Sequence, residues 1–88
     1  MNYKVTVGRA AYEALQLDIH TRAVEMGVQS IEDYRKGALI TGTLDQLEHF
    51  ADFFHPSCLS EDLPSADRRA CERDRQKILA FVAKQRTL

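Results

Sequence analysis

The stretch that decides the fold is Ala38–Pro56, ALITGTLDQLEHFADFFHP, which carries three of the four phenylalanines. It begins with a short apolar run between two glycines, a pattern typical of a buried strand with a turn at each end. A Thr-x-x-Gln capping box then starts at Thr43 and indicates the beginning of a helix. Pro56 ends the helix because the residue before a proline is pushed out of the α region. The stretch therefore predicts a strand over 38–41 and a helix over 44–54.

Other elements surround this stretch on both sides. Alternating residues predict a strand over 3–7, and helical spacing predicts a helix over 10–26 that ends at Gly27. Ser65 is placed to cap a long C-terminal helix over 66–85. We expect an α+β fold in one domain, with a small antiparallel sheet of two or three strands packed against three helices.

Residues 28–36 allow two interpretations. Ser30 and the acids after it suit the first turn of a short helix that ends at Gly37. Alternatively, the segment forms a strand that turns back into the strand over 38–41. Capping slightly favours the short helix, whereas the sheet favours the strand, because two isolated strands are marginal in water.

The apolar faces of these elements predict the hydrophobic core. A chain of 88 residues buries about two thirds of the surface that its unfolded form exposes, so its stability is modest. The predicted core residues are Val5, Val7, Leu15, Ile19, Ala23, Leu39, Leu44, Leu47, Phe50, Phe54, Ile78, Phe81 and Val82.

Charge is unevenly spread along the chain, whose net charge is −1. Residues 1–65 hold 5 Lys/Arg and 10 Asp/Glu, a net of −5, whereas residues 66–88 hold 7 Lys/Arg and 3 Asp/Glu, a net of +4. This complementarity, together with open strand edges, predicts a homodimer. The alternative is a monomer whose C-terminal helix folds back on its own body.

The sequence predicts a cytoplasmic protein. No apolar run approaches the roughly 20 residues that a membrane helix needs. The N-terminus lacks the apolar segment of a signal peptide. The two cysteines are expected to be reduced thiols.

The candidate partner-binding residues are acids on the outer side of the helix over 44–54 and two aromatics. Aromatic residues beside such acids mark protein interfaces. On size and charge alone, we expect a non-enzymatic protein-binding module, an accessory or inhibitory subunit on a larger partner. Phage or mobile-element inhibitors of nucleic-acid-handling complexes are of similar size and charge. The predicted set is Asp45, Glu48, Asp52, Phe53 and Tyr34.

The alternative function is a DNA- or RNA-binding regulator that uses the Arg-rich C-terminal helix. Acids interrupt this basic segment, its cations wrap around the helix, and the net charge is negative, so a solvated helix with internal ion pairs is favoured. The alternative binding residues are Arg68, Arg69, Arg73, Arg75 and Lys77.

Histidine and cysteine spacing gives only a weak metal pattern. His55 and Cys58 have knuckle-like spacing, and imidazole and thiolate suit zinc. His49 lies six residues before His55, off its helix face, and Cys71 lies on another helix. No nucleotide-binding glycine loop, GxSxG or HExxH motif is present. We therefore expect no metal, no cofactor and no catalytic activity.

Overall fold

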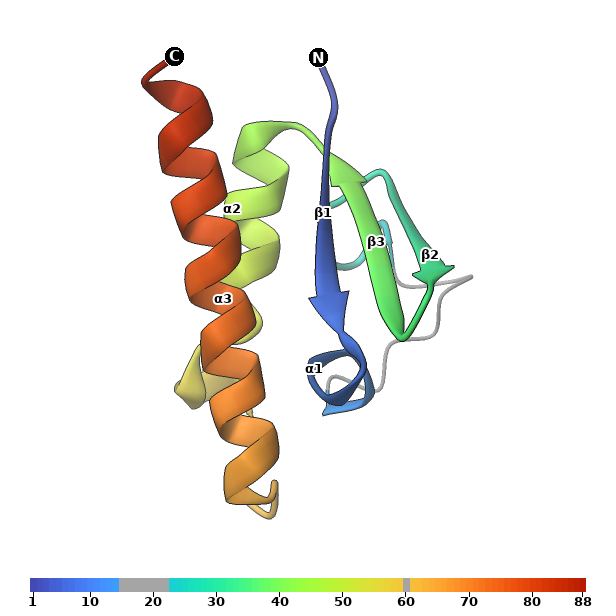
Figure 1. Cartoon of the computed structure of the whole chain (residues 1–88), viewed down its shortest axis with the longest axis vertical. Coiled ribbons are helices and arrows are strands. Elements are labelled where there is room, and N and C mark those ends of the chain that lie inside the picture. The colour runs from blue at the N-terminus through green and yellow to red at the C-terminus, as the bar shows by residue number, and fades with distance from the viewer. Residues whose placement is uncertain (15–22, 60) are drawn as a thin grey trace.

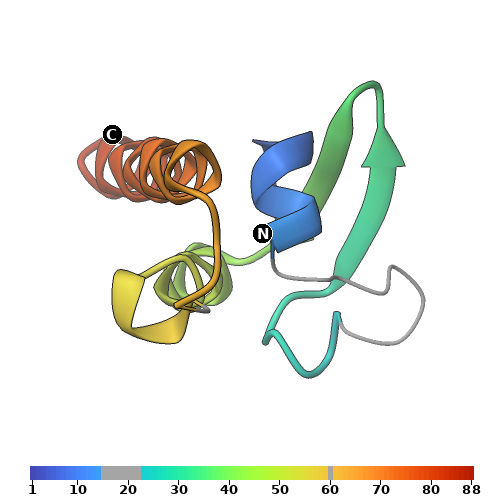
Figure 2. The same cartoon turned by 90° about the horizontal axis from the view of Figure 1, so that it is seen from below.

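The computed structural model describes residues 1–14, 23–59 and 61–88. In it, α2 and α3 lie on one side of a three-stranded sheet, and α1 lies beside α3 at one end of the sheet (Figure 1, Figure 2). This is the α+β fold that the sequence predicts. The elements in chain order are β1 (Tyr3–Gly8), α1 (Arg9–Ala14), β2 (Ser30–Tyr34), β3 (Gly37–Gly42), α2 (Leu44–Asp52), the 3-10 turn η1 (Pro56–Cys58) and α3 (Ser65–Arg86).

The sheet is antiparallel, with strand order β1-β3-β2. Ile40 of the central strand lies opposite Val5 on one side and Ile31 on the other. All three side chains are buried, so this row faces the helices. A slip of one residue would turn the row toward solvent, and the burial of these side chains therefore fixes the register.

Residues 30–34 form a strand, so the short helix favoured by capping is wrong. β2 and β3 are joined by a tight turn through Arg35 and Lys36, in which Arg35 has a φ of 52°. Pairing with β3 buries Ile31 to 3% exposure and supplies the third strand that the sheet needs. These gains depend on a distant strand and outweigh the local capping preference.

The helix predicted over 10–26 is observed only in part. α1 ends at Ala14, and residues 15–22 lie outside the described residues, together with the predicted core residues Leu15 and Ile19. Residues 23–27 form turns, so a continuous helix to residue 26 is wrong.

These turns nevertheless have the hydrogen bonds of a helix C-terminus. The Val28 N–H donates to the Ala23 carbonyl oxygen at 2.9 Å, and the Gly27 N–H donates to the Val24 carbonyl oxygen at 3.1 Å. Gly27 has a φ of 79°, which a residue with a side chain rarely adopts. The pair of bonds is the Schellman pattern, which confirms the predicted place of Gly27.

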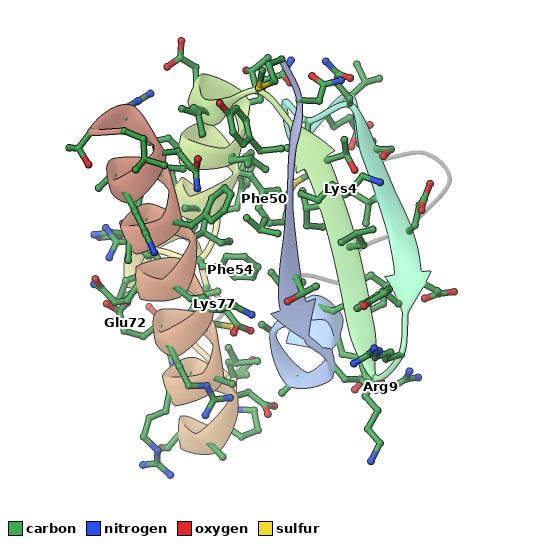
Figure 3. All side chains as sticks on the ribbon, turned by 45° about the horizontal axis from the view of Figure 1, so that its top comes forward. Lys4, Arg9, Phe50, Phe54, Glu72 and Lys77 are labelled. Atoms are coloured by element: carbon green, nitrogen blue, oxygen red, sulfur yellow. The ribbon has the colours of Figure 1, made fainter. Side chains whose placement is uncertain are left out.

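α2 begins as predicted. The Gln46 N–H donates to Thr43 Oγ1 at 3.2 Å, and Gln46 Oε1 accepts from the Thr43 N–H at 2.9 Å, which completes the capping box. The helix ends at Asp52, two residues earlier than predicted. Phe50 and Phe54 point between the helices and the sheet and meet edge to face, with ring centroids 5.4 Å apart (Figure 3).

α3 has 22 residues and begins at Ser65, with Pro64 at the N-cap position and no side-chain capping bond. The prediction that Ser65 itself caps the helix is therefore wrong by one residue. No helix in the described ranges is both long and apolar enough to cross a membrane.

α3 also holds the outer edge of β1. Asp74 Oδ2 accepts a hydrogen bond from the Gly8 N–H at 3.0 Å. Lys77 extends toward β1 (Figure 3), where its Nζ donates to the Thr6 carbonyl oxygen at 3.1 Å and to Thr6 Oγ1 at 2.9 Å. The edge of β1 is therefore only partly open, contrary to the expectation of open sheet edges, because α3 side chains occupy the Gly8 N–H and the Thr6 carbonyl oxygen.

Most of the predicted core is confirmed. Three predicted residues are only partly buried against the core: Ala23, Leu44 and Phe81. The prediction of Leu39 as a core residue is wrong, because it lies on the opposite face of β3 from Ile40. The predicted residues that are buried are Val5, Val7, Leu47, Phe50, Phe54, Ile78 and Val82. The prediction missed Ala11, Met26, Val28, Ile31, Ala38, Ile40, Ala51, Ala70 and Cys71.

Phe50 has no exposed surface, so its truncation should leave a cavity. We predict that Phe50→Ala lowers the free energy of unfolding by about 3–5 kcal/mol in urea titration followed by circular dichroism. Phe53→Ala, at the C-cap of the same helix, is the matched control, and its cost should be smaller because Phe53 is only half-buried. Near-normal stability of Phe50→Ala would contradict the core assignment.

Asp74 is 6% exposed and accepts the Gly8 N–H. We predict that Asp74→Ala lowers the free energy of unfolding by about 1–3 kcal/mol, because it removes a hydrogen bond to a charged acceptor. Asp74→Asn retains a carbonyl acceptor of the same shape and should lose less. Equal stability of the Ala variant and the unsubstituted protein would show that this contact does not hold the edge.

Candidate functional site

The acidic side of α2 is partly paired within the chain. Arg86 Nη1 lies 2.6 Å from Glu48 Oε2, and Arg86 Nη2 contacts Asp45 Oδ1. All three side chains are at least 40% exposed, so each pair stabilises the fold by at most about 1 kcal/mol. Their main effect is to neutralise these acids locally. The end of α3 thus folds back on the body, as in the monomer alternative to a charge-driven dimer.

Two other predicted residues lie together at the opposite end of α2. A depression of about 230 Å³ is lined there by His49, Asp52, Phe53 and Cys58. The His49 and Phe53 rings meet edge to face, with centroids 5.4 Å apart, and Phe53 remains half-buried. Phe53 therefore lies at the edge of the core, where an aromatic ring is accessible to a partner.

The turn after α2 brings Cys58 to this depression. Pro56 begins η1, and the Cys58 N–H donates to the His55 carbonyl oxygen at 2.8 Å. His55 Nδ1 accepts from the Ser57 N–H at 3.2 Å and caps the turn. A capped turn of this kind fixes the distance of Cys58 from α2.

Gly27 fixes the position of His49. A Cβ atom on Gly27 would lie only 2.7 Å from His49 Cδ2, so the backbone of the Ala23–Val28 turn packs closely against the imidazole ring. His49 is therefore held between Gly27 and Phe53. The sequence contained a partial signal for this arrangement, because His49 and Phe53 are four residues apart within the predicted helix over 44–54.

Tyr34 lies elsewhere. It ends β2, the edge strand on the far side of the sheet from α3 (Figure 1), and it is 39% exposed. The guanidinium carbon of Arg35 lies 5.2 Å from the centre of its ring. The five predicted partner-binding residues thus occupy three separate places: Asp45 and Glu48 share Arg86, Asp52 and Phe53 share the depression, and Tyr34 lies alone on β2.

The candidates for zinc do not converge in the described part of the chain. No group of three or more His, Cys, Asp or Glu side chains there could hold a metal ion. His55 Nδ1 is occupied by Ser57, whose Oγ lies 2.8 Å away. Cys71 is buried in the core, whereas Cys58 is exposed, so the two thiols do not share one site.

The predicted nucleic-acid residues divide into anchored and solvent-facing groups. Arg68 Nε donates to the Leu63 carbonyl oxygen at 3.3 Å, and Arg75 Nη1 lies 3.4 Å from Glu72 Oε1. Lys77 is exposed but is hydrogen-bonded to Thr6, whereas the other two are exposed and form no ion pair in the described ranges. That exposed pair is Arg69 and Arg73.

Comparison of the chain with models of protein families, with curated proteins and with solved structures found no match. Function is therefore inferred from the geometry of this chain alone. The depression beside Phe53 is the place where predicted partner-binding residues meet.

The two thiols should differ sharply in reactivity. Burial, followed by the charges of Asp74 and Asp67, raises the pKa of Cys71 above its ordinary value of 9.0. Because the thiolate is the nucleophile, Cys71 should be inert in the folded protein, whereas the exposed Cys58 should react. We predict that a disulfide reagent modifies one thiol per chain rapidly and the second only in denaturant.

Single substitutions assign the two phases. Cys58→Ser should abolish the rapid phase, and Cys71→Ser should leave it intact. Rapid modification of both thiols under native conditions would contradict the burial of Cys71.

Proposed function

We propose that the chain is a small, non-enzymatic protein-binding module that acts as an accessory or inhibitory subunit on a larger partner. The observation that carries the proposal is the half-buried Phe53, which lines a depression with Asp52 beside it. Buried aromatic anchors in small pockets dominate the energy of many interfaces. A neighbouring carboxylate adds orientation and selects against anionic partners.

The size of the depression supports a protein partner. Sites for small ligands are about 300–1,000 Å³, whereas this depression is about 230 Å³. It suits one apolar or aromatic side chain of a partner. A lysine or arginine next to that side chain would pair with Asp52.

The geometry around His55 supports a non-catalytic role. His55 Nδ1 and Ser57 Oγ are 2.8 Å apart, a distance that a nucleophile and its base also show. In this turn, however, the same nitrogen accepts the Ser57 N–H. Among the described residues, no hydrogen-bond partner orients the other imidazole nitrogen, so the pair is best explained as a cap.

The location, the inhibitory role and the homodimer expected from the sequence remain proposals. We place the module in the cytoplasm, and an inhibitor of nucleic-acid-handling machinery is one role that suits its size and charge. The homodimer stays a prediction. Its contact would involve Phe53, because Arg86 already pairs within the chain and the exposed Glu32 and Asp33 oppose pairing at the outer edge of β2.

Affinity capture tests the proposal. A partner captured from source cells by the tagged chain is purified and titrated calorimetrically against variants. We predict that Phe53→Ala weakens binding at least about 30-fold, as expected for an interface anchor worth 2 kcal/mol or more. Asp52→Asn should weaken it less.

Tyr34→Ala is the control, because this exposed aromatic lies away from the depression. Unchanged affinity of Phe53→Ala together with loss of binding in Tyr34→Ala would move the interface to β2.

A further inference from the structure

The solvent-facing side of α3 is basic along most of its length. Four exposed cations follow one another at intervals of four, four and seven residues, which places them within an arc of about 80° around the helix axis. They extend along about 22 Å of the helix. We call this surface the basic face of α3, made of Arg69, Arg73, Lys77 and Lys84.

The acids of α3 do not lie on this face. Asp74 is 6% exposed and is turned toward Gly8, and Asp67 is half-buried. Glu72 lies at the flank, where it accepts from Arg75 Nη1 at 3.4 Å and from Gln76 Nε2 at 2.9 Å. The buried Asp74 therefore interrupts the basic segment in the sequence but not on the surface, whereas Glu72, whose side chain is 44% exposed, borders the face and is paired with Arg75.

Three cations of the basic face are available to a partner. Arg69, Arg73 and Lys84 form no ion pair with any residue in the described ranges, whereas Lys77 is partly occupied by Thr6. Lys77 contacts Thr6 of β1, and no described residue is ion-paired with any of the four cations. Helix α3 forms the outer margin of the molecule (Figure 1, Figure 2). The exposed Ala80 lies between the cations and allows close approach.

We propose that the basic face of α3 binds the phosphate backbone of double-stranded nucleic acid without reading its sequence. A duplex carries one negative charge per about 1.7 Å of its axis, so a row of cations meets phosphates in any register. The face has no aromatic residue: Phe81, the aromatic residue of α3, packs edge to face on Tyr3, with ring centroids 6.1 Å apart. Single-strand binding relies on such rings for stacking, so the duplex is favoured.

This surface is independent of the depression beside Phe53. The depression is built by α2 and the turn after it, whereas the basic face belongs to α3 alone. Either binding activity can therefore fail in an experiment without affecting the other.

Fluorescence anisotropy with a short labelled duplex of random sequence tests the proposal. Three phosphate contacts predict a slope of about −2.7 for log affinity against log salt concentration. The affinity should then fall about 40-fold between roughly 50 and 200 mM salt.

Two double variants with equal loss of charge locate the contact. R69Q/R73Q should bind more weakly at low salt and lose only about 3- to 4-fold over the same salt range, because about one contact remains. K4Q/K36Q removes two exposed cations outside α3 and should behave as the unsubstituted protein. Thermal melts should show both variants folded, since all four positions are exposed.

Each opposite result overturns the proposal. Absence of salt-dependent binding, or equal losses in both double variants, would remove the basic face as the contact. Binding to a single strand of the same length as tightly as to the duplex would reject the duplex. Equal displacement by polyglutamate would show a surface for acidic proteins instead.

Discussion

The rotational setting of α3 against β1 is the constraint on which the rest of the structure depends. Asp74 receives the Gly8 N–H, and Lys77 donates to Thr6, so two side chains one turn apart hold the helix to the strand edge. With the helix held this way, its apolar residues face α2 and the sheet. The same setting leaves Arg69 toward solvent.

Attachment of α3 also decides which parts of the molecule remain available to partners. Two backbone groups on the outer edge of β1 are occupied. The outer edge of β2 carries the exposed acids Glu32 and Asp33, which oppose pairing with a second copy of the chain. The depression beside Phe53 and the basic face of α3 remain. They lie on different helices and have different chemistry, one aromatic with a carboxylate and the other cationic.

The sequence by itself determined the helices that have local signals. The capping box at Thr43 and the spacing of Phe50 and Phe54 predicted α2 to within two residues of its end. Gly27 was placed correctly because a left-handed residue after a helical turn needs no tertiary partner. Such signals act between residues a few positions apart, so they can be read before the fold is known.

Only the tertiary structure decided the features that depend on distant partners. Residues 30–34 became a strand because β3 was available to pair, and Leu39 faced outward because the sheet register placed Ile40 inside. The place of Phe53 at a depression required the turn that carries Cys58. The exposed charge of α3 depended on the burial of Asp74 against β1, which sequence spacing does not encode.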